Sequence, residues 1–357
     1  MGHLSNFLNR FFKPNSQEHT TDFSALFNLP FQEWIDDAKV PGMAITILKQ
    51  GKQVFQKGYG WADIERRKPV DPQKSIFRIA SASKPIASMA LAKMVMAEQI
   101  DLDKSFYDYV PYFPKKKFDF TIRQLAAHTA GIRGYKGKEY ALNKPYTIKE
   151  SLELFQKDSL LFRPGTSYLY NSFDWVLISL AMEEVSGVPF STYVQNEILN
   201  PLGMKNTTVE IPGEIPEDMA VPYSRINSGF RPAVPVDNRY KLAGGGYLST
   251  SGDLAKFGLA VLEKSLVSPE VMKEFLIPQK VNGYSTHYGL GWQVSADKMG
   301  RLLIGHVGNG VGGYSNFFIY PEHKTVISLL INCTDPKVQP LLDELVLPSL
   351  MDRLSQV

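Results

Sequence analysis

The stretch Ser81-Ala82-Ser83-Lys84 joins a short extended segment to a helix, and the interpretation of the whole chain depends on it. Apolar residues recur every three to four positions between residues 86 and 97, which predicts an amphipathic helix. With Ser81 near the N-cap, Ser81 and Lys84 lie one turn apart on one face of that helix. Pro85 then falls in the first turn, where its missing N–H costs little.

Lys84 stands where acidic residues are usual, because the N-terminus of a helix carries partial positive charge. A residue that breaks a local stability rule is a candidate for function. The helix field and burial would both lower the pKa of this lysine. A neutral amine beside a serine hydroxyl is a general base that activates a nucleophile. The alternative is an ordinary helix cap with a solvated lysine.

The Ser-x-x-Lys spacing by itself is weak support. It recurs at Ser295-Ala296-Asp297-Lys298, in a polar stretch with no apolar helix behind it, which we interpret as a turn. Other residues must therefore decide whether Ser81 is a nucleophile.

Length and composition indicate a globular protein with a sizeable core. The 357 residues allow two or three domains. The net charge is only +3, and the one basic run, Lys115-Lys116-Lys117, follows Pro114 as a solvated loop would. Nucleic acid is therefore not an expected partner. The single cysteine, Cys333, excludes an internal disulfide framework, and its apolar surroundings predict a buried thiol.

The N-terminal segment allows more than one interpretation. It has no secretory apolar region, and the chain has no apolar run of about 18 residues. As written the sequence is cytoplasmic, or periplasmic or extracytoplasmic if a leader has been removed. Apolar residues at helical spacing within residues 4–12 predict either peripheral membrane contact or a short helix packed on the domain. The oligomeric state is left open.

The order of predicted elements indicates α+β architecture. Two strands near residues 43–48 and 53–59 precede a mainly helical middle, and strands return near 288–294, 301–306, 314–320 and 325–332. This predicts an antiparallel sheet flanked by helices and built from both chain ends, with an inserted mainly helical domain. The boundaries expected are a tail or short helix at 1–24, a sheet domain at 25–85 and 241–357, and a helical domain at 86–240.

Tyr170-Asn171-Ser172 is a second candidate for the site, because it precedes an apolar helix. A tyrosine at that position can present its hydroxyl to a crevice, and a nearby lysine with the helix dipole would lower its pKa. The alternative is that Asn171 or Ser172 caps the helix while Tyr170 packs in the core.

A third candidate is the glycine-rich segment at 305–315. Its Gly308, Gly310 and Gly313 match G-x-G-x-x-G, but a strand-like run follows where a dinucleotide site needs a helix. A glycine-rich strand edge instead lets a ligand approach the backbone closely. His306 would supply positive charge or a hydrogen bond to a carboxylate or oxyanion. The histidines show no metal-ligand spacing, so no metal or other cofactor is expected.

His128 is interpreted as structural, because it lies at a helix C-terminus just before Gly131.

The order Ser81-x-x-Lys84, Tyr170-Asn171-Ser172 and His306-Val307-Gly308 resembles the serine β-lactamase and penicillin-binding-protein-like superfamily. It is most similar to the class C β-lactamase-related group, which includes family VIII carboxylesterases, D-aminopeptidases and mitochondrial β-lactamase-like proteins. Further matches extend over residues 25–350. They include Val40-Pro41-Gly42-Met43, Leu125 to Gly131, Gly244 to Thr250 and Tyr288 to Trp292.

The resemblance implies a β-lactamase/transpeptidase-like fold and a role for each motif residue. Ser81 would be the acylated nucleophile, with Lys84 as its proton partner and Tyr170 as general base. His306 and Gly308 stand where relatives often carry K-T-G, and His306 would flank the substrate. The backbone N–H groups of Ser81 and Asn309 would form the oxyanion hole. Ser172 and Asn171 are counted among the residues around the substrate.

One departure from the family pattern bears on the substrate. The second motif is usually Tyr-x-Asn, whereas here the third position is Ser172 and the amide has moved to Asn171, whose side chain should point elsewhere. The sequence therefore predicts a serine hydrolase acting through an acyl-enzyme on a small ester or amide, with weak or no β-lactamase activity. The alternatives are a D-amino-acid peptidase or β-lactamase, and a penicillin-binding sensor that acylates without turnover.

Overall fold

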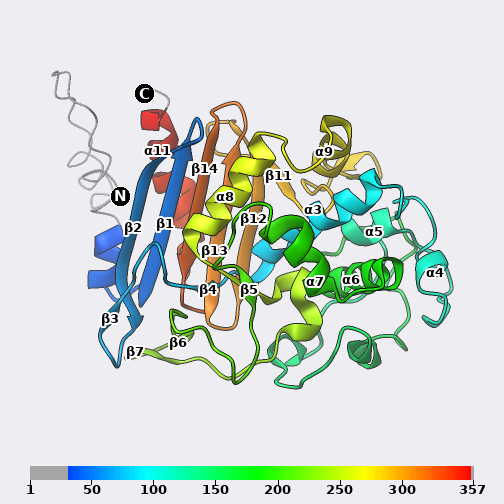
Figure 1. Ribbon diagram of the computed structural model, residues 1–357, viewed down its shortest axis with the longest axis horizontal. Coiled ribbons are helices and arrows are strands. Elements are labelled where there is room, and N and C mark those ends of the chain that lie inside the picture. Colours follow the sequence, from blue (N-terminus) through cyan, green and yellow to red (C-terminus); the bar gives the residue numbers. More distant parts are fainter. Residues whose placement is uncertain (1–30, 355–357) are drawn as a thin grey trace.

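The computed structural model describes residues 31–354 (Figure 1). The tail predicted at 1–24, with its amphipathic segment at 4–12, lies outside the described residues. The domain boundaries predicted from the sequence stay a prediction.

A seven-stranded sheet, ordered β11-β12-β13-β14-β1-β2-β3 with every pair antiparallel, forms the centre of the fold. Its strands come from the two ends of the chain: β1 (Gly42–Lys49), β2 (Lys52–Asp63), β3 (Lys68–Pro69), β11 (Gln293–Ala296), β12 (Leu302–Gly310), β13 (Gly313–Tyr320) and β14 (Thr325–Ile331). The first and last of these segments meet where Met43 of β1 lies opposite Ile331 of β14. The predicted antiparallel sheet, flanked by helices and built from both chain ends, is confirmed.

Strand β1 is buried almost throughout because both faces of the sheet are covered. Successive side chains of a strand point to opposite faces. Ala44 and Leu48 accordingly join the core under α8 (Ser251–Leu262), while Ile45 and Ile47 join a second core. The residues on that second side come from the helical segment at 31–36 and from α11 (Leu347–Leu354). Figure 1 shows α8 crossing one face of the sheet and α11 lying at the other.

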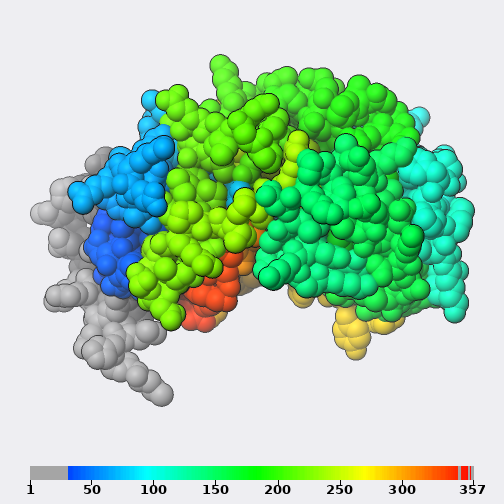
Figure 2. Space-filling model, turned by 90° about the horizontal axis from the view of Figure 1, so that it is seen from below, coloured from blue at the N-terminus to red at the C-terminus, as the bar shows by residue number. Residues whose placement is uncertain are grey.

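The middle of the chain is mainly helical, as predicted. The remaining helices are α3 (Ser83–Met96), α4 (Phe106–Tyr109), α5 (Ile122–Ala126), α6 (Phe173–Ser186), α7 (Phe190–Val194), α9 (Pro269–Leu276) and α10 (Gln339–Leu341). Small sheets add β4 (Phe77–Arg78), β5 (Thr208–Val209), β6 (Tyr223–Ile226), β7 (Gly229–Pro232), β8 (Tyr247–Ser249), β9 (Lys280–Val281) and β10 (Tyr284–Ser285). Seen from below in Figure 2, the yellow-green segment with β6 and β7 lies between the blue N-terminal strands and the green helical part.

Helix α3 differs from the amphipathic helix predicted behind Ser81. Its first twelve residues are buried apart from Lys93, because α6, α7, α9 and the turn at 242–246 pack around it. The helix that carries Lys84 is therefore the buried centre of the helical part.

The strand predicted at residues 288–294 begins only at Gln293. The preceding residues form a loop, because Gly289 lies close against α9 and Gly291 adopts a left-handed backbone conformation. A Cβ on Gly289 would lie 2.3 Å from the Phe275 carbonyl oxygen, and Gly291 has a φ of +88°. In the second Ser-x-x-Lys match, Ser295 and Ala296 lie in β11, so the interpretation of the whole stretch as a turn is wrong there, and only Lys298 lies in the turn that follows. No helix follows this match, in contrast to Ser81.

Within residues 31–354 no helix is long and apolar enough to cross a membrane. In the same range no group of three or more His, Cys, Asp or Glu side chains is placed to hold a metal ion. Cys333 is a buried free thiol, as predicted.

Candidate active site

Ser81 lies in a single 3₁₀ turn, η1 (Ala80–Ala82), directly before α3, whose N-cap is Ala82. The preceding residue, Ala80, has a φ of +45°, in the left-handed region that non-glycine residues rarely occupy. Such a conformation persists only where the surroundings enforce it, and it is common at functional sites. Here Gly245 and Gly310 leave room for Ala80, since a Cβ on either would lie within 3.4 Å of it.

Lys84 is completely buried, and its ammonium points at Ser81. Nζ lies 3.1 Å from Ser81 Oγ and donates a 2.6 Å hydrogen bond to the carbonyl oxygen of Gly244. Burial lowers the pKa of Lys84 to about 7, and the charge of Lys241 adds to this shift. The amine is therefore available in its neutral form near neutral pH, as the sequence predicts.

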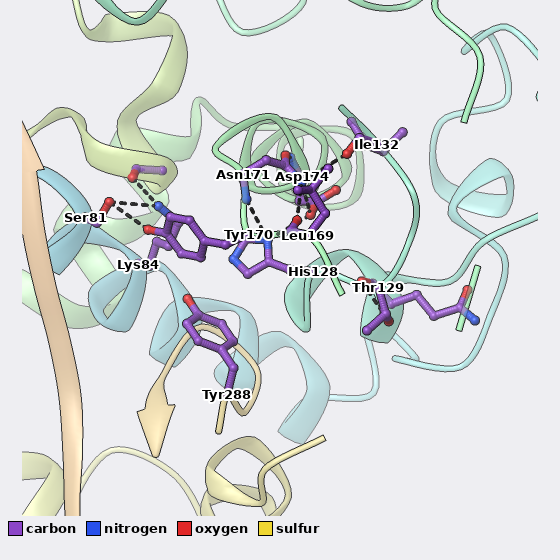
Figure 3. A network of polar contacts seen from close by, with 12 residues as sticks. Ser81, Lys84, His128, Thr129, Ile132, Leu169, Tyr170, Asn171, Asp174 and Tyr288 are labelled. Atoms are coloured by element: carbon purple, nitrogen blue, oxygen red, sulfur yellow. Dashed lines mark hydrogen bonds and ion pairs between the residues drawn. The ribbon is translucent and has the colours of Figure 1, made fainter. Parts of the chain in front are cut away.

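Tyr170 approaches Ser81 from the other side, at the start of α6. Its hydroxyl donates a 2.8 Å hydrogen bond to Ser81 Oγ, and the ring lies 4.7 Å from Lys84 Nζ. Figure 3 shows the three side chains converging from the two helix starts. The expectation that the lysine would lower the pKa of Tyr170 is wrong, because burial raises that pKa above its ordinary value. Tyr170 is a protonated phenol near neutral pH.

Asn171 is turned away from the pocket, as expected from its position in the motif, and its inclusion among the residues around the substrate is therefore wrong. Its Oδ1 accepts a 2.9 Å hydrogen bond from the Asp174 backbone N–H and so caps α6. Its Nδ2 donates to Asp174 Oδ2 at 2.7 Å and to the Leu169 and Ile132 carbonyl oxygens. The side chain is 4% exposed, and its polar atoms are used inside the protein.

His128 and Asp174 form a buried pair behind Tyr170. His128 Nδ1 lies 2.8 Å from Asp174 Oδ2, and the two ring centroids of His128 and Tyr170 are 4.6 Å apart. Burial raises the pKa of Asp174 and lowers the pKa of His128, so both groups favour their uncharged forms. The pair supports the tyrosine ring from behind, which fits the structural interpretation of His128.

His306 does not flank the pocket as a cation. It is 1% exposed on β12, where Nε2 lies 3.0 Å from the Tyr288 hydroxyl and Nδ1 lies 2.6 Å from the Val307 carbonyl oxygen. Burial, with the charge of Lys84, lowers the pKa of His306 to about 3. Of the two roles expected for His306, the positive charge is therefore wrong, and His306 is a neutral residue that packs against Tyr170.

The edge of β12 beside Ser81 presents backbone N–H groups. Gly310 and Gly313 pair across a two-residue turn, so by alternation the N–H groups of Asn309 and Val307 face away from β13. The Val307 N–H accordingly donates to Gln293 Oε1 at 2.9 Å. Gly308 lets this edge reach η1, since a Cβ there would lie 2.9 Å from the Ser81 backbone nitrogen. The Ser81 and Asn309 amides thus lie at one junction.

Ser81 opens into a pocket of about 90 Å³. The residues that line it are Arg78, Ala80, Ser81, Tyr135, Tyr140, Ser172, Asn238, Lys241, Gly244, Gly245, Asn309, Gly310 and Val311. Ser172 and Asn309 were predicted to be part of the site, whereas Lys241, Tyr135 and Asn238 were not. The only sequence signal for Lys241 is its position just before the glycine run at 244–246.

The chain is similar to known proteins in both sequence and fold. The sequence model of the β-lactamase family matches residues 22–349. The human mitochondrial serine β-lactamase-like protein LACTB is 29% identical, over 80% of this chain and 70% of its own length.

Solved structures have the same fold. The octameric penicillin-binding protein homologue from Pyrococcus abyssi is 27% identical, with a TM-score of 0.81 over 93% of this chain and 78% of that one. The D-amino acid amidase from Ochrobactrum anthropi SV3 is 22% identical, with a TM-score of 0.79 over 92% and 99%. At 22% identity, the similarity to the amidase shows only that the two proteins share a fold.

Proposed function

The chain belongs to the β-lactamase family, and on that premise we propose that it is a serine hydrolase that acylates Ser81 with a small ester or amide substrate. One observation carries the proposal. Ser81 Oγ lies within hydrogen-bonding distance of both Lys84 Nζ, at 3.1 Å, and the Tyr170 hydroxyl, at 2.8 Å. An activated nucleophile needs a base and an orienting partner within such distances.

Lys84 is the base in the first step. With its pKa lowered to about 7, a neutral Nζ accepts the Ser81 proton while it continues to donate to the Gly244 carbonyl oxygen. As the proton leaves, Oγ forms a bond to the substrate carbonyl carbon. The Ser81 and Asn309 amides are placed to donate to the oxyanion that develops.

Tyr170 is the acid in the second half of that step, because its raised pKa keeps the phenol protonated. The bond to the leaving group breaks, the phenol gives that group a proton, and Lys84 returns a proton to the phenolate. This differs from the role of base that the family resemblance implies for Tyr170. Water then attacks the acyl carbon and loses a proton to Lys84. The bond from that carbon to Ser81 Oγ breaks, Oγ takes the proton back from Lys84, and a carboxylic acid leaves.

The pocket favours short acyl groups over β-lactams. Its volume of about 90 Å³ is small beside the roughly 300–1,000 Å³ of pockets for drug-sized ligands. Ser172 offers a hydroxyl where related enzymes place an amide, and Asn171 is committed to Asp174. We therefore propose weak or no turnover of β-lactams.

An activity panel tests the proposal. Purified protein is assayed with short-chain p-nitrophenyl esters, nitrocefin and D-amino acid amides, with Ser81→Ala as control and fluorophosphonate labelling as an independent readout. Ester turnover that depends on Ser81 supports the proposal. Turnover of the D-amino acid amides alone supports the peptidase alternative, and a lasting penicillin adduct without ester turnover supports a sensor.

A further inference from the structure

The charged residues that line the Ser81 pocket are all cationic. Arg78 and Lys241 line it, and no Asp or Glu of the described residues does so. A cleft whose wall carries one sign of charge attracts ligands of the opposite sign. The two cations differ in one respect: whether a carboxylate of the protein already pairs with them.

Arg78 is neutralised within the protein. Its Nε and Nη2 donate to the two carboxylate oxygens of Glu210 at 2.7 and 2.5 Å, and Nη1 donates to the Val311 carbonyl oxygen at 2.8 Å. Such a bidentate pair uses the planar donors of the guanidinium fully. Arg78 therefore has a structural partner in the absence of substrate.

Lys241 has no such partner. It is 8% exposed, and its Nζ donates to the Tyr140 carbonyl oxygen at 2.7 Å and lies 5.3 and 5.6 Å from the Tyr135 and Tyr240 rings. No carboxylate of the described residues lies within salt-bridge distance of it.

The carboxylates that adjoin Lys241 and its acceptor Tyr140 in the sequence are already paired. Glu139, next to Tyr140, binds Arg133 at 2.6 Å, and Asp237 binds Arg239 at 2.5 Å. Burial lowers the pKa of Lys241 to about 8, with the charge of Arg78 adding to the effect, so the ammonium is mainly charged near pH 7. A buried charge without a counter-ion is costly, and an anion in the pocket would offset that cost.

We propose that Lys241 binds a carboxylate on the acyl part of the substrate, so that the enzyme prefers short acyl groups that end in a carboxylate, such as succinyl or glutaryl. The inference rests on the proposed function, since the acyl group must be attached to Ser81 while its far end reaches Lys241. Asn238 and Tyr135 line the same pocket.

Paired anilides test the preference. The mono-p-nitroanilides of succinic and glutaric acid are compared at pH 7 with their neutral counterparts, in which a primary amide replaces the free carboxylate. The expected ratio of kcat/KM, anionic over neutral, is about tenfold or more, as for a charge-assisted hydrogen bond of about 1.5–3 kcal/mol. The ratio cancels effects on the chemical step that both substrates share.

Three variants test whether Lys241 is the source of the preference for the anionic anilides. Lys241→Met should bring the ratio to one or below, and Lys241→Arg should keep part of it. Lys116→Met is the matched control, because Lys116 is also held by backbone carbonyl oxygens, those of Gln156 and Asp158, but lines a different pocket. It should leave the ratio unchanged.

Binding is measured independently of turnover by thermal shift. Glutarate should raise the Tm of Ser81→Ala more than glutaramide does, and the added Lys241→Met substitution should remove the difference. A ratio of one or below in the wild type, or a ratio that Lys241→Met leaves intact, overturns the inference. If no anilide is turned over, equal Tm shifts of Ser81→Ala with glutarate and glutaramide also overturn the inference. If Ser81→Ala hydrolyses the neutral anilides as fast as the wild type, the proposed function itself fails.

Discussion

The Tyr170 hydroxyl donates a 2.8 Å hydrogen bond to Ser81 Oγ, while Lys84 Nζ approaches the same oxygen from the opposite helix start at 3.1 Å. Burial moves the pKa values of the two partners in directions that suit different tasks. It lowers the pKa of the lysine and raises that of the tyrosine. The pair therefore combines a neutral amine, which accepts a proton, with a phenol that retains one.

Replacing either partner should slow ester hydrolysis without unfolding the protein. We expect Lys84→Met to lower kcat/KM by about 1,000-fold and Tyr170→Phe by about 100-fold or more, because general acid–base groups contribute on this scale. Steady-state kinetics with p-nitrophenyl acetate measures the loss, and circular dichroism checks the fold. Wild-type rates in Tyr170→Phe would remove the phenol from the mechanism.

Activity on a neutral ester should rise with pH through the pKa of Lys84. That pKa is about 7, and only the neutral amine accepts the Ser81 proton, so kcat/KM should increase about tenfold per pH unit below pH 6 and level off above pH 8. Because the pKa of Tyr170 is raised, no fall is expected before pH 10. A profile that falls between pH 6 and 8 contradicts the assignment of the base.

Substitution of Asn171 should mainly lower stability, whereas substitution of Ser172 should mainly change substrate binding. Asn171→Ala removes the cap of α6 and a partner of buried Asp174, which should cost about 2–3 kcal/mol of unfolding free energy. Ser172 lines the pocket. Ser172→Ala should therefore change KM while lowering the unfolding free energy by less than about 1 kcal/mol. Urea unfolding and kinetics on both variants provide the comparison. A large KM change in Asn171→Ala with unchanged stability would show that the amide does contact substrate.

Gly308 should be intolerant of any side chain. A Cβ there would lie 2.3 Å from Ser315 Oγ and 2.4 Å from the Ile79 carbonyl oxygen, so Gly308→Ala must push β12 away from η1. We expect at least a 100-fold loss of kcat/KM, since displacement of the backbone donors on this scale abolishes their effect. Gly134→Ala is the control, because the nearest atom to its Cβ would be 3.7 Å away. Equal activity of the two variants would contradict the placement of the oxyanion hole.

The sheet could be predicted because its signals are local, since the apolar runs of β13 and β14 show their strand character directly. The Ser81-x-x-Lys84 spacing was weak by itself, and only the ordered resemblance that it shares with Tyr170 and His306 singled it out. The position of Asn171 in its motif likewise predicted that its side chain would point elsewhere.

The rest depended on contacts between distant segments. Lys241 has an ordinary sequence context, and only the packing of Tyr135 and Tyr140 around it reveals a buried cation. The positive charge, one of the two roles expected for His306, is wrong because the side chain is buried and hydrogen-bonded to Tyr288, which lies in a loop that was predicted as strand. The direction of the Tyr170 pKa shift follows from burial of the hydroxyl, which no local pattern encodes.

Peptide mapping of the trapped acyl-enzyme tests the central claim most directly. The protein is quenched in acid during turnover of a p-nitrophenyl ester, and the intact mass and proteolytic fragments are measured. We predict one added acyl group on the peptide that contains Ser81, absent in Ser81→Ala. An acyl group on another residue, or undiminished ester hydrolysis by purified Ser81→Ala, would contradict the account.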